Sequence, residues 1–216
     1  MTETVAYASG AGRRAPHAGL PAVNLARFEV LVVPGLHDSG PGHWQTRWVE
    51  EHRRFRRVVQ DDWETPTLNP WAAAVARAID RCASPPLVVA HSFGCLATLR
   101  ATHLFERRIA GALLAAPADP DKFGVLAQLP SRRLPYPTIL VGTNNDPWLK
   151  LTKAGLLAKR WGSEFVGLYN AGHLNAESGH GPWPEGYRLL RRLAALAHPN
   201  PQQVHDGGIF DRITAR

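Results

Sequence analysis

The sequence predicts one α/β domain, a three-layer α/β/α sandwich built around a mostly parallel sheet. Short apolar runs rich in β-branched residues recur along the chain, and helical patterns separate them. Strands that are apolar on both faces are typical of a parallel sheet covered on both sides, and right-handed crossovers produce that arrangement. The length of 216 residues allows one sizeable core and is too short for two ordinary domains.

Six segments are expected to form strands, most of them because they are short apolar runs bounded by turn-forming residues. They are residues 28–33, 55–60, 87–90, 109–115, 137–142 and 164–169. Helices are expected at residues 43–52, 69–82, directly after residue 92, 147–160 and 184–198. We expect Asn69 to cap the second helix, with Pro70 in its first turn. On the last helix, the expected apolar stripe is Leu189, Leu193 and Leu196.

The two ends of the chain differ in composition from its middle. Residues 1–24 are rich in Ala and Gly with few large apolar side chains, so we expect a flexible N-terminal tail. The α/β domain is then expected at residues 25–198, and residues 199–216 are expected to be a loose C-terminal tail. The sizeable irregular stretch inside the domain, residues 117–135, leaves no room for a large lid.

The chain carries a formal net charge of +7, but its basic residues are mostly Arg and are spread along the sequence. The densest cluster, residues 53–57, has no signature of a nucleic-acid-binding fold, so we expect a solvated edge and no nucleic-acid partner. The excess of Arg over Lys, with many Ala and Pro residues, is typical of a GC-rich bacterium.

Several features favour a cytoplasmic location. The sequence has no apolar run of about 18 or more residues, so we expect no transmembrane helix and no membrane partner. Arg13 and Arg14 are followed by a segment that Pro and His interrupt, which is unlike a signal peptide. Cys82 and Cys95 have no motif spacing and are expected to be buried thiols in a reducing compartment.

The most informative segment follows the strand at 87–90. The residues there are His91-Ser92-Phe93-Gly94, and a helical pattern begins at once. This matches the G-x-S-x-G nucleophile elbow, with Ala90 in place of the first Gly. Such a turn lifts the serine hydroxyl above the sheet edge and aims the next backbone N–H at developing negative charge. A serine that only caps the helix is the alternative.

Two further residues follow strands and complete the expected machinery. Asp146 follows the fifth expected strand, and His173 follows the sixth, with Gly172 directly before it. The order Ser…Asp…His is the one that α/β-hydrolases use. We therefore expect Ser92 to be the nucleophile, His173 the general base and Asp146 the acid that orients it.

Other residues compete for these roles. Asp146 also fits a helix cap ahead of Pro147. Asn144 and Asn145 are weaker candidates for the acid, because an amide cannot stabilise an imidazolium as a carboxylate does. His91 lies inside the elbow and is expected to pack or hydrogen-bond beneath the nucleophile.

The loop at 34–44, after the first strand, is expected to supply a second oxyanion donor. Gly35 permits the turn, and the N–H of Leu36 would act together with the N–H of Phe93. The candidate pocket residues beside the site loops are His37, Trp44, Trp148 and Trp183. Packing in the core or in loops is an equal alternative for the three tryptophans.

Four motifs together carry a family resemblance. They are Pro-Gly-Leu-His-Asp-Ser-Gly-Pro-Gly-His-Trp-Gln, Ala-His-Ser-Phe-Gly, Asn-Asp-Pro-Trp and Ala-Gly-His-Leu-Asn-Ala-Glu-Ser-Gly-His-Gly-Pro-Trp-Pro-Glu-Gly. Over residues 28–197 the chain resembles the small bacterial serine hydrolases related to retinoblastoma-binding protein 9. The resemblance implies a minimal α/β-hydrolase fold and a triad of Ser92, Asp146 and His173. It implies no natural substrate, and no retinoblastoma-type partner is expected because the Leu-x-Cys-x-Glu segment is absent.

The sequence therefore predicts a serine hydrolase that cleaves a small carboxylic ester or amide through an acyl-enzyme intermediate. No cofactor is expected, and no metal, because the histidine pairs 37/43 and 173/180 lack metal-ligand spacing and a third ligand. The alternatives are a non-catalytic member that binds a ligand or protein in the same cleft, and an acyltransferase that uses the same triad. Dehalogenation is disfavoured because its nucleophile is a carboxylate.

Overall fold

The structure is a computed structural model that describes residues 25–197. Six strands form one sheet in the order β2-β1-β3-β4-β5-β6, and every neighbouring pair is parallel. In chain order the strands are Val30–Val33, Phe55–Arg57, Leu87–His91, Gly111–Ala115, Thr138–Thr143 and Glu164–Leu168. The predicted sandwich is confirmed, and its sheet is parallel throughout. The tails predicted at residues 1–24 and 199–216 lie outside the described residues.

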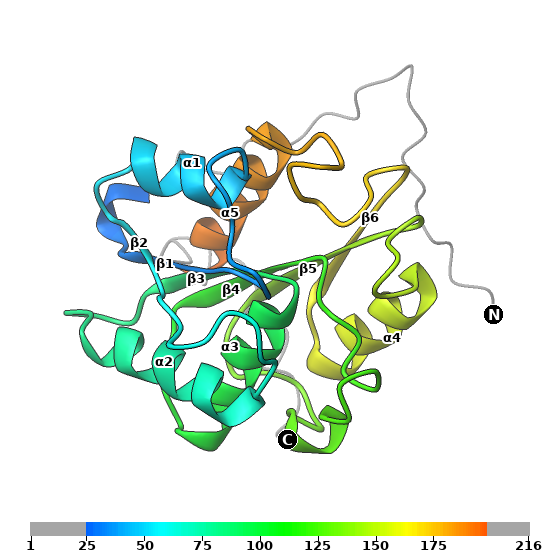
Figure 1. Ribbon diagram of the computed structural model, residues 1–216. Helices are drawn as coiled ribbons and strands as arrows, with labels where there is room; N and C mark the ends of the chain where they lie inside the picture. Colours follow the sequence, from blue (N-terminus) through cyan, green and yellow to red (C-terminus); the bar gives the residue numbers. More distant parts are fainter. Residues whose placement is uncertain (1–24, 198–216) are drawn as a thin grey trace, which may run out of the picture.

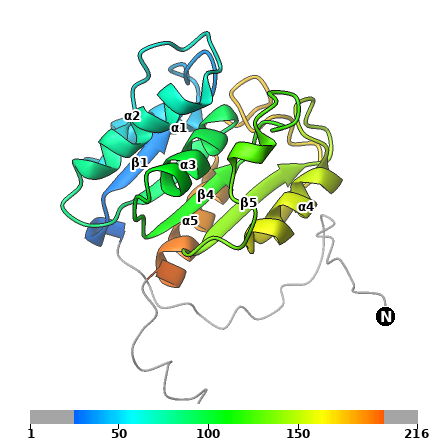
Figure 2. The ribbon, with the colours of Figure 1, turned by 90° about the horizontal axis from the view of Figure 1, so that it is seen from below.

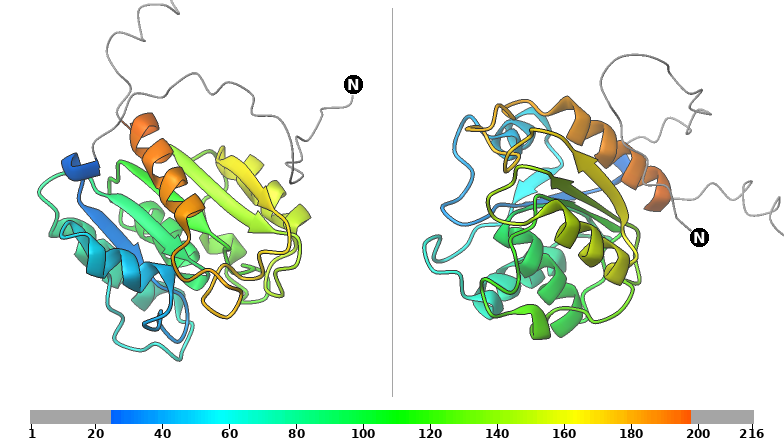
Figure 3. Two further views of the ribbon diagram at one scale, coloured as in Figure 1. Left: turned by 90° about the horizontal axis from the view of Figure 1, so that it is seen from above. Right: turned by 90° about the vertical axis from the view of Figure 1, so that its right-hand side faces the viewer.

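Helices cover both faces of this sheet. They are α1 (Trp44–Glu51), α2 (Leu68–Asp80), α3 (Phe93–Leu104), α4 (Leu151–Trp161) and α5 (Pro184–Ala197). Helices α1 and α5 lie on one face, and α2, α3 and α4 lie on the other (Figure 1). Figure 2 shows the face with three helices from below, and Figure 3 shows α1 and α5 in front of the sheet from above. None of the helices within residues 25–197 is long and apolar enough to span a bilayer.

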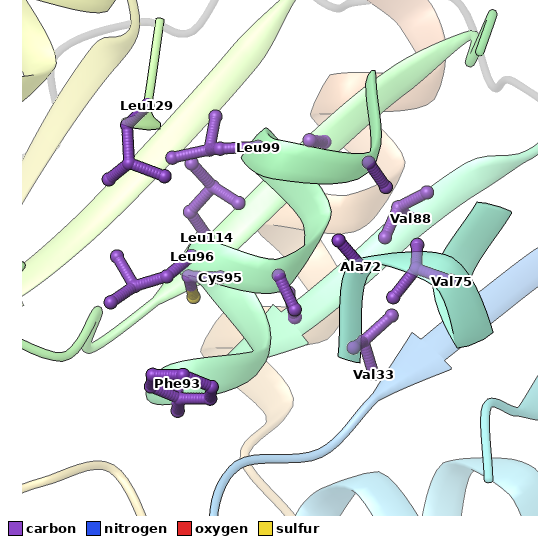
Figure 4. Packing of buried hydrophobic residues seen from close by; sticks show 14 of the residues in the cluster. Val33, Ala72, Val75, Val88, Phe93, Cys95, Leu96, Leu99, Leu114 and Leu129 are labelled. Atoms are coloured by element: carbon purple, nitrogen blue, oxygen red, sulfur yellow. The ribbon is translucent and has the colours of Figure 1, made fainter. Parts of the chain in front are cut away.

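The core alternates along each strand because successive side chains of a strand point to opposite faces. Val88 and Leu114 pack with α2 and α3, whereas Val89 and Leu113 pack with α1 and α5. Figure 4 shows the first of these clusters, with Leu96 and Leu99 of α3 packed among buried residues such as Leu114 of β4. The four inner strands β1, β3, β4 and β5 are buried on both faces, which explains their largely apolar sequence, whereas the edge strands β2 and β6 are partly exposed.

Two local predictions about the helices are wrong. Helix α2 begins one residue early, with Thr67 at the N-cap, so Asn69 lies inside the first turn and its Oδ1 accepts from Arg100 Nε. On α5 the buried residues include Leu190 and Leu193, whereas Leu196 is 43% exposed. The apolar positions of α5 allow two overlapping stripes, and the helix is rotated so that the one with Leu190 faces the sheet.

Cysteine burial differs between the two thiols. Cys95 of α3 is fully buried, as expected, and burial raises the pKa of its thiol well above the usual value. Cys82, after α2, is only partly buried and accepts a hydrogen bond from Arg56. Both thiols are free, and the prediction that they are buried is confirmed for Cys95 and wrong for Cys82.

Candidate active site

Ser92 occupies the sharp turn between β3 and α3. Its backbone has φ 51° and ψ −123°, a left-handed conformation that is strained for a residue with a side chain. The neighbouring chain leaves no room for larger residues. A Cβ on Gly94 would lie 2.3 Å from the carbonyl oxygen of Pro34, and one on Gly35 would lie 2.7 Å from Cβ of Ser92. The two glycines therefore let the first loop approach the serine.

Three side chains from three strand ends meet in a hydrogen-bonded chain. Ser92 Oγ lies 2.9 Å from His173 Nε2. On the other side of the ring, His173 Nδ1 lies 3.0 Å from each carboxylate oxygen of Asp146. Because a carboxylate only accepts, Nδ1 carries the proton, and Nε2 is free to accept from the serine hydroxyl. The Asp146 side chain is 1% exposed and that of His173 is 11% exposed, so the chain is shielded from solvent.

The two asparagines considered as alternatives to Asp146 hydrogen-bond to the backbone of another loop. Asn144 Oδ1 accepts from the backbone N–H of Asn170 at 2.7 Å, and Asn145 Oδ1 accepts from that of Gly172 at 2.8 Å. The hydroxyl of Thr143 also donates to the carbonyl oxygen of Gly172. Side chains at the end of β5 thus clamp the loop that carries the histidine. The signal in the sequence was the pair of asparagines directly after a strand, which had been considered only as candidates for the acid.

Asp146 does not cap a helix. Its Oδ1 accepts from the backbone N–H of Trp148 at 2.9 Å, but α4 begins only at Leu151, with Lys150 at its N-cap. The carboxylate therefore closes a short turn and faces His173 at the same time. This contact fixes the carboxylate in place and satisfies part of its remaining hydrogen-bonding capacity.

The loop between β1 and α1 is held by a buried polar network that the sequence analysis missed. Gln45, fully buried, donates from Nε2 to the carbonyl oxygens of Val33 at 3.0 Å and Val89 at 3.3 Å. Its Oε1 accepts from the hydroxyl of Ser39 at 2.7 Å. Arg57 pairs with Asp38 in the same loop, so part of the basic cluster at 53–57 is structural rather than only solvated.

This network supports a strained loop beside the serine. His37 has φ 63° and Asp38 has φ 62°, conformations that glycine adopts most readily. Leu36 lies along the cavity next to Ser92. Phe93 is the first residue of α3, where N–H groups have no partner within the helix. Both expected oxyanion donors therefore belong to segments that flank Ser92.

A cavity of about 490 Å³ opens at this edge of the sheet. Ser92, His91 and His173 contribute to its wall, and so do His37 and Trp148 among the predicted pocket residues. The remaining wall includes the apolar side chains of Leu36, Ala118 and Phe123. Trp148 is 49% exposed at the cavity, and its ring lies 6.2 Å from that of His173.

The prediction that Trp44 and Trp183 line the pocket is wrong. Both indoles are buried in the core beneath α1 and α5, with ring centroids 4.8 Å apart. Trp44 Nε1 donates to the carbonyl oxygen of Leu174 at 2.8 Å. These large rings fill the space between α1 and the loop before α5, which proximity in sequence to the site could not reveal.

Two more histidines lie next to His173. His91 Nε2 is 2.7 Å from the carbonyl oxygen of His173, so His91 hydrogen-bonds beneath the site as expected. Burial, and then the repulsion that a protonated ring would feel from His173 and His43, hold the pKa of His91 well below its usual value. Burial, followed by repulsion from Arg57 and His173, lowers the pKa of His43 to about 4. Both imidazoles are therefore neutral at pH 7.

The residues between 25 and 197 contain no cluster of three metal-ligating side chains. His37 Nδ1 instead pairs with Glu64 at 2.8 Å, and His43 Nδ1 accepts from the N–H of Gln45 at the start of α1. His180 Nδ1 lies 3.5 Å from the hydroxyl of Ser178.

Comparison with known proteins identifies relatives of this chain. A family model described as serine hydrolase matches residues 30–192. A YdeN-like hydrolase from Pectobacterium atrosepticum is 34% identical, with a TM-score of 0.78 over 81% of this chain and 95% of the other. A search of curated proteins found no match.

More distant structures share the fold. A hydrolase of the alpha/beta superfamily from Xanthomonas campestris is 16% identical, with a TM-score of 0.56 over 77% of this chain and 98% of the other. The esterase RhEst1 from Rhodococcus sp. is 12% identical, with a TM-score of 0.59 over 80% of this chain and 92% of the other. The sandwich is thus a minimal α/β-hydrolase fold. Because the family model spans most of the domain and a 34% identical relative covers it, the chain belongs to the serine hydrolase family.

Proposed function

We propose that the protein cleaves a small carboxylic ester or amide through an acyl-enzyme intermediate, with Ser92, His173 and Asp146 as its triad. The observation that carries this proposal is the hydrogen-bonded chain from Ser92 Oγ through His173 to Asp146. Its tautomer is the one that general-base catalysis requires, because Nε2 accepts while Nδ1 donates.

In the first half of the reaction, Ser92 Oγ attacks the carbonyl carbon while His173 Nε2 takes the hydroxyl proton. The negative oxygen is stabilised by the N–H groups of Phe93 and Leu36, each contributing on the order of 3 kcal/mol. As the C–O or C–N bond breaks, His173 returns the proton to the leaving alcohol or amine, and the acyl group stays on Ser92. Asp146 stabilises the imidazolium in both transition states.

In the second half, a water molecule takes the position of the leaving group. His173 removes its proton while the water oxygen attacks the acyl carbon, and the carboxylic acid leaves as Ser92 recovers its hydrogen. The 490 Å³ cavity suits a small substrate, and its wall of Leu36, Phe123 and Trp148 suits an apolar group.

A fluorophosphonate probe tests the proposal, because it labels serines that an adjacent base activates. One adduct per chain is expected, and peptide mapping should place it on Ser92. Ser92→Ala should fold normally, lose the label and lose about 10⁶-fold in kcat for a p-nitrophenyl ester. Ser84→Ala, at an exposed serine on the opposite edge of the sheet, is the matched control.

The outcomes separate the alternatives. An adduct on another serine, or turnover that survives in Ser92→Ala, contradicts the mechanism. Absence of labelling and of turnover on esters and amides favours a binding protein that uses the same cleft. Transfer of the acyl group to an added alcohol or amine in preference to water favours an acyltransferase.

Several finer statements stay predictions. They are the relationship to retinoblastoma-binding protein 9, a bacterial source, a cytoplasmic location and the absence of nucleic-acid, membrane and retinoblastoma-type partners. Measured binding to DNA and to lipid vesicles would address the partner predictions. Each of these leaves the chemistry at Ser92 unchanged.

A further inference from the structure

Three imidazole rings form a row of successive contacts along the wall of the cavity. The centroids of His43 and His91 are 4.9 Å apart, and those of His91 and His173 are 4.7 Å apart. The three residues come from separate elements, namely the N-cap of α1, the last position of β3 and the loop after β6. The proposed mechanism uses only His173, so the other two rings need an explanation.

His91 connects the serine strand to the backbone of the base. Its Nε2 lies 2.7 Å from the carbonyl oxygen of His173, and since a carbonyl only accepts, Nε2 carries the proton. The next residue along the chain, Ser92, contacts the ring of His173 at 2.9 Å. Two consecutive residues of the elbow therefore contact the same histidine, His91 at its main chain and Ser92 at its ring.

The ring of His43 contacts the middle ring, that of His91. The two rings are inclined at 62° to each other, in an edge-on contact. His43 Nδ1 accepts from the N–H of Gln45, so the proton of the neutral ring is on Nε2. That Nε2 is buried and has no hydrogen-bond partner among the described residues, so His43 contacts His91 through its ring and not through a hydrogen bond.

The chemistry of the neighbouring base requires this row to stay uncharged. His173 becomes positive in each transition state of the proposed mechanism, and a second cation 4.7 Å away would oppose that charge. The groups that face His91 are His43 and Trp44 from α1 and His173 from the loop after β6. A buried neutral donor is therefore the form of His91 that suits the site.

We propose that His91 is a positioning residue, whose bond to the His173 carbonyl holds the imidazole in reach of Ser92 Oγ. The inference rests on the proposed function. Loss of this bond frees the backbone at His173 while Asp146 still holds the ring, so the serine–imidazole contact lengthens. A displacement of about 1 Å at a reacting group lowers the rate by up to about 10²-fold.

Two variants of His91 test the donor itself. His91→Gln places an amide N–H where Nε2 stands, whereas His91→Met has similar length but no donor. Met is expected to lower kcat on a p-nitrophenyl ester by about 10- to 100-fold with little change in KM, and to slow fluorophosphonate labelling equally. Gln should recover most of the rate. His103→Met, at an exposed histidine of α3, is the matched control.

Amide hydrogen exchange provides a readout that does not depend on turnover. His91→Met should raise exchange in the loop at 170–174, and His91→Gln should restore protection. Met and Gln variants that lose rate equally, in step with a fall in Tm, assign His91 to packing alone and overturn the inference. Normal kcat and normal loop protection in His91→Met overturn it as well.

The two proposals fail in different ways. A wild-type chain that neither takes the probe nor turns over esters contradicts the proposed function and this inference together. A wild-type chain that is labelled on Ser92, with His91→Met labelled as fast, contradicts the inference alone.

Discussion

The two edges of the sheet are built differently. At the carboxyl edge the cavity measures about 490 Å³, whereas the cavity at the amino edge measures about 960 Å³. The larger one is lined by arginines that include Arg108, Arg132 and Arg133. The smaller one holds Ser92 and the imidazole row. The cavity that holds the proposed triad is therefore the smaller of the two.

Backbone strain, unlike cavity size, is concentrated at the carboxyl edge of the sheet. Eight non-glycine residues within 25–197 have a positive φ, and Glu106 is the one that lies at the amino edge. The others lie in segments that follow the carboxyl ends of strands: His37, Asp38, Ser92, Ala116, Asn170, Leu174 and Trp183. Strain of this kind persists only where surrounding contacts determine the conformation, and it concentrates at functional sites. The networks around Gln45 and Asn145 supply such contacts.

Among the variants at the two edges, Asp146→Asn is expected to cause the largest loss of activity. The amide can donate to His173 Nδ1 and thereby favours the wrong tautomer, a change that slows a serine protease about 10⁴-fold. We expect a loss of similar size in kcat for a p-nitrophenyl ester, with the circular dichroism spectrum unchanged. Asp80→Asn is the control, because Asp80 pairs with Arg107 at 2.7 Å and does not line the cavity that holds Ser92. A near-normal rate in Asp146→Asn would move the role to Asp119 or Asp121.

Gln45→Leu should have the next largest effect. The change leaves two buried carbonyl oxygens and the Ser39 hydroxyl without their partner, and each such group destabilises by about 1–3 kcal/mol. A total near 3 kcal/mol corresponds to a fall in Tm on the order of 10 °C for a domain of this size. Thermal unfolding measures it, with Gln128→Leu as the control. An unchanged Tm would mean that the loop before α1 needs no such anchor.

Acid should weaken the carboxyl edge through His43. The folded-state pKa of about 4 lies below the usual histidine value of 6.5, so between these values the unfolded chain binds more protons than the folded one. Stability is therefore fully present above pH 6.5 and falls as the pH drops toward 4. One pH unit below 6.5, the loss from His43 is roughly 1.4 kcal/mol. The same direction holds for His91.

His43→Asn isolates this contribution, because asparagine keeps an N-cap acceptor for α1 but does not titrate. Urea unfolding between pH 7 and pH 5 should show a smaller acid loss in this variant than in wild type. His103→Asn should retain the wild-type slope. Equal slopes for wild type and His43→Asn would show that His43 is already charged, or already exposed, in the folded chain.

Particular residues show how far the sequence alone predicts this molecule. The elbow at Ser92 and the strand ends at Asp146 and His173 are local patterns joined by a known topology, so their meeting could be predicted. Trp44 could not be assigned in the same way, because its burial depends on helix α1 folding over the sheet toward Leu174. The prediction for Leu196 was wrong for a related reason, since several stripes on α5 satisfy the helical period and only tertiary packing selects one.

The polar side chains that hold the loops around the site were the part of it least predictable from the sequence. Gln45 bridges Val33 and Val89, which are 56 residues apart in sequence and adjacent only in the sheet. Asn144 and Asn145 were recognised as polar residues near the site, but their backbone targets at 170 and 172 belong to another loop. A hydrogen bond between distant segments leaves no periodicity to detect, whereas a nucleophile elbow leaves a motif.

The amino edge should tolerate change without loss of activity, which is the smallest effect expected. Arg108 and Arg132 are exposed there, at the opposite end of the strands from Ser92. Screening by solvent makes exposed charges this remote from the site nearly without influence on its barrier. Arg108→Gln combined with Arg132→Gln should keep kcat/KM on a neutral ester within about twofold, and Tm within a few degrees. Trp148→Ala, at the smaller cavity, is the comparison variant and should change KM. A large fall in kcat/KM from the arginine pair would couple the two edges and end the contrast between them.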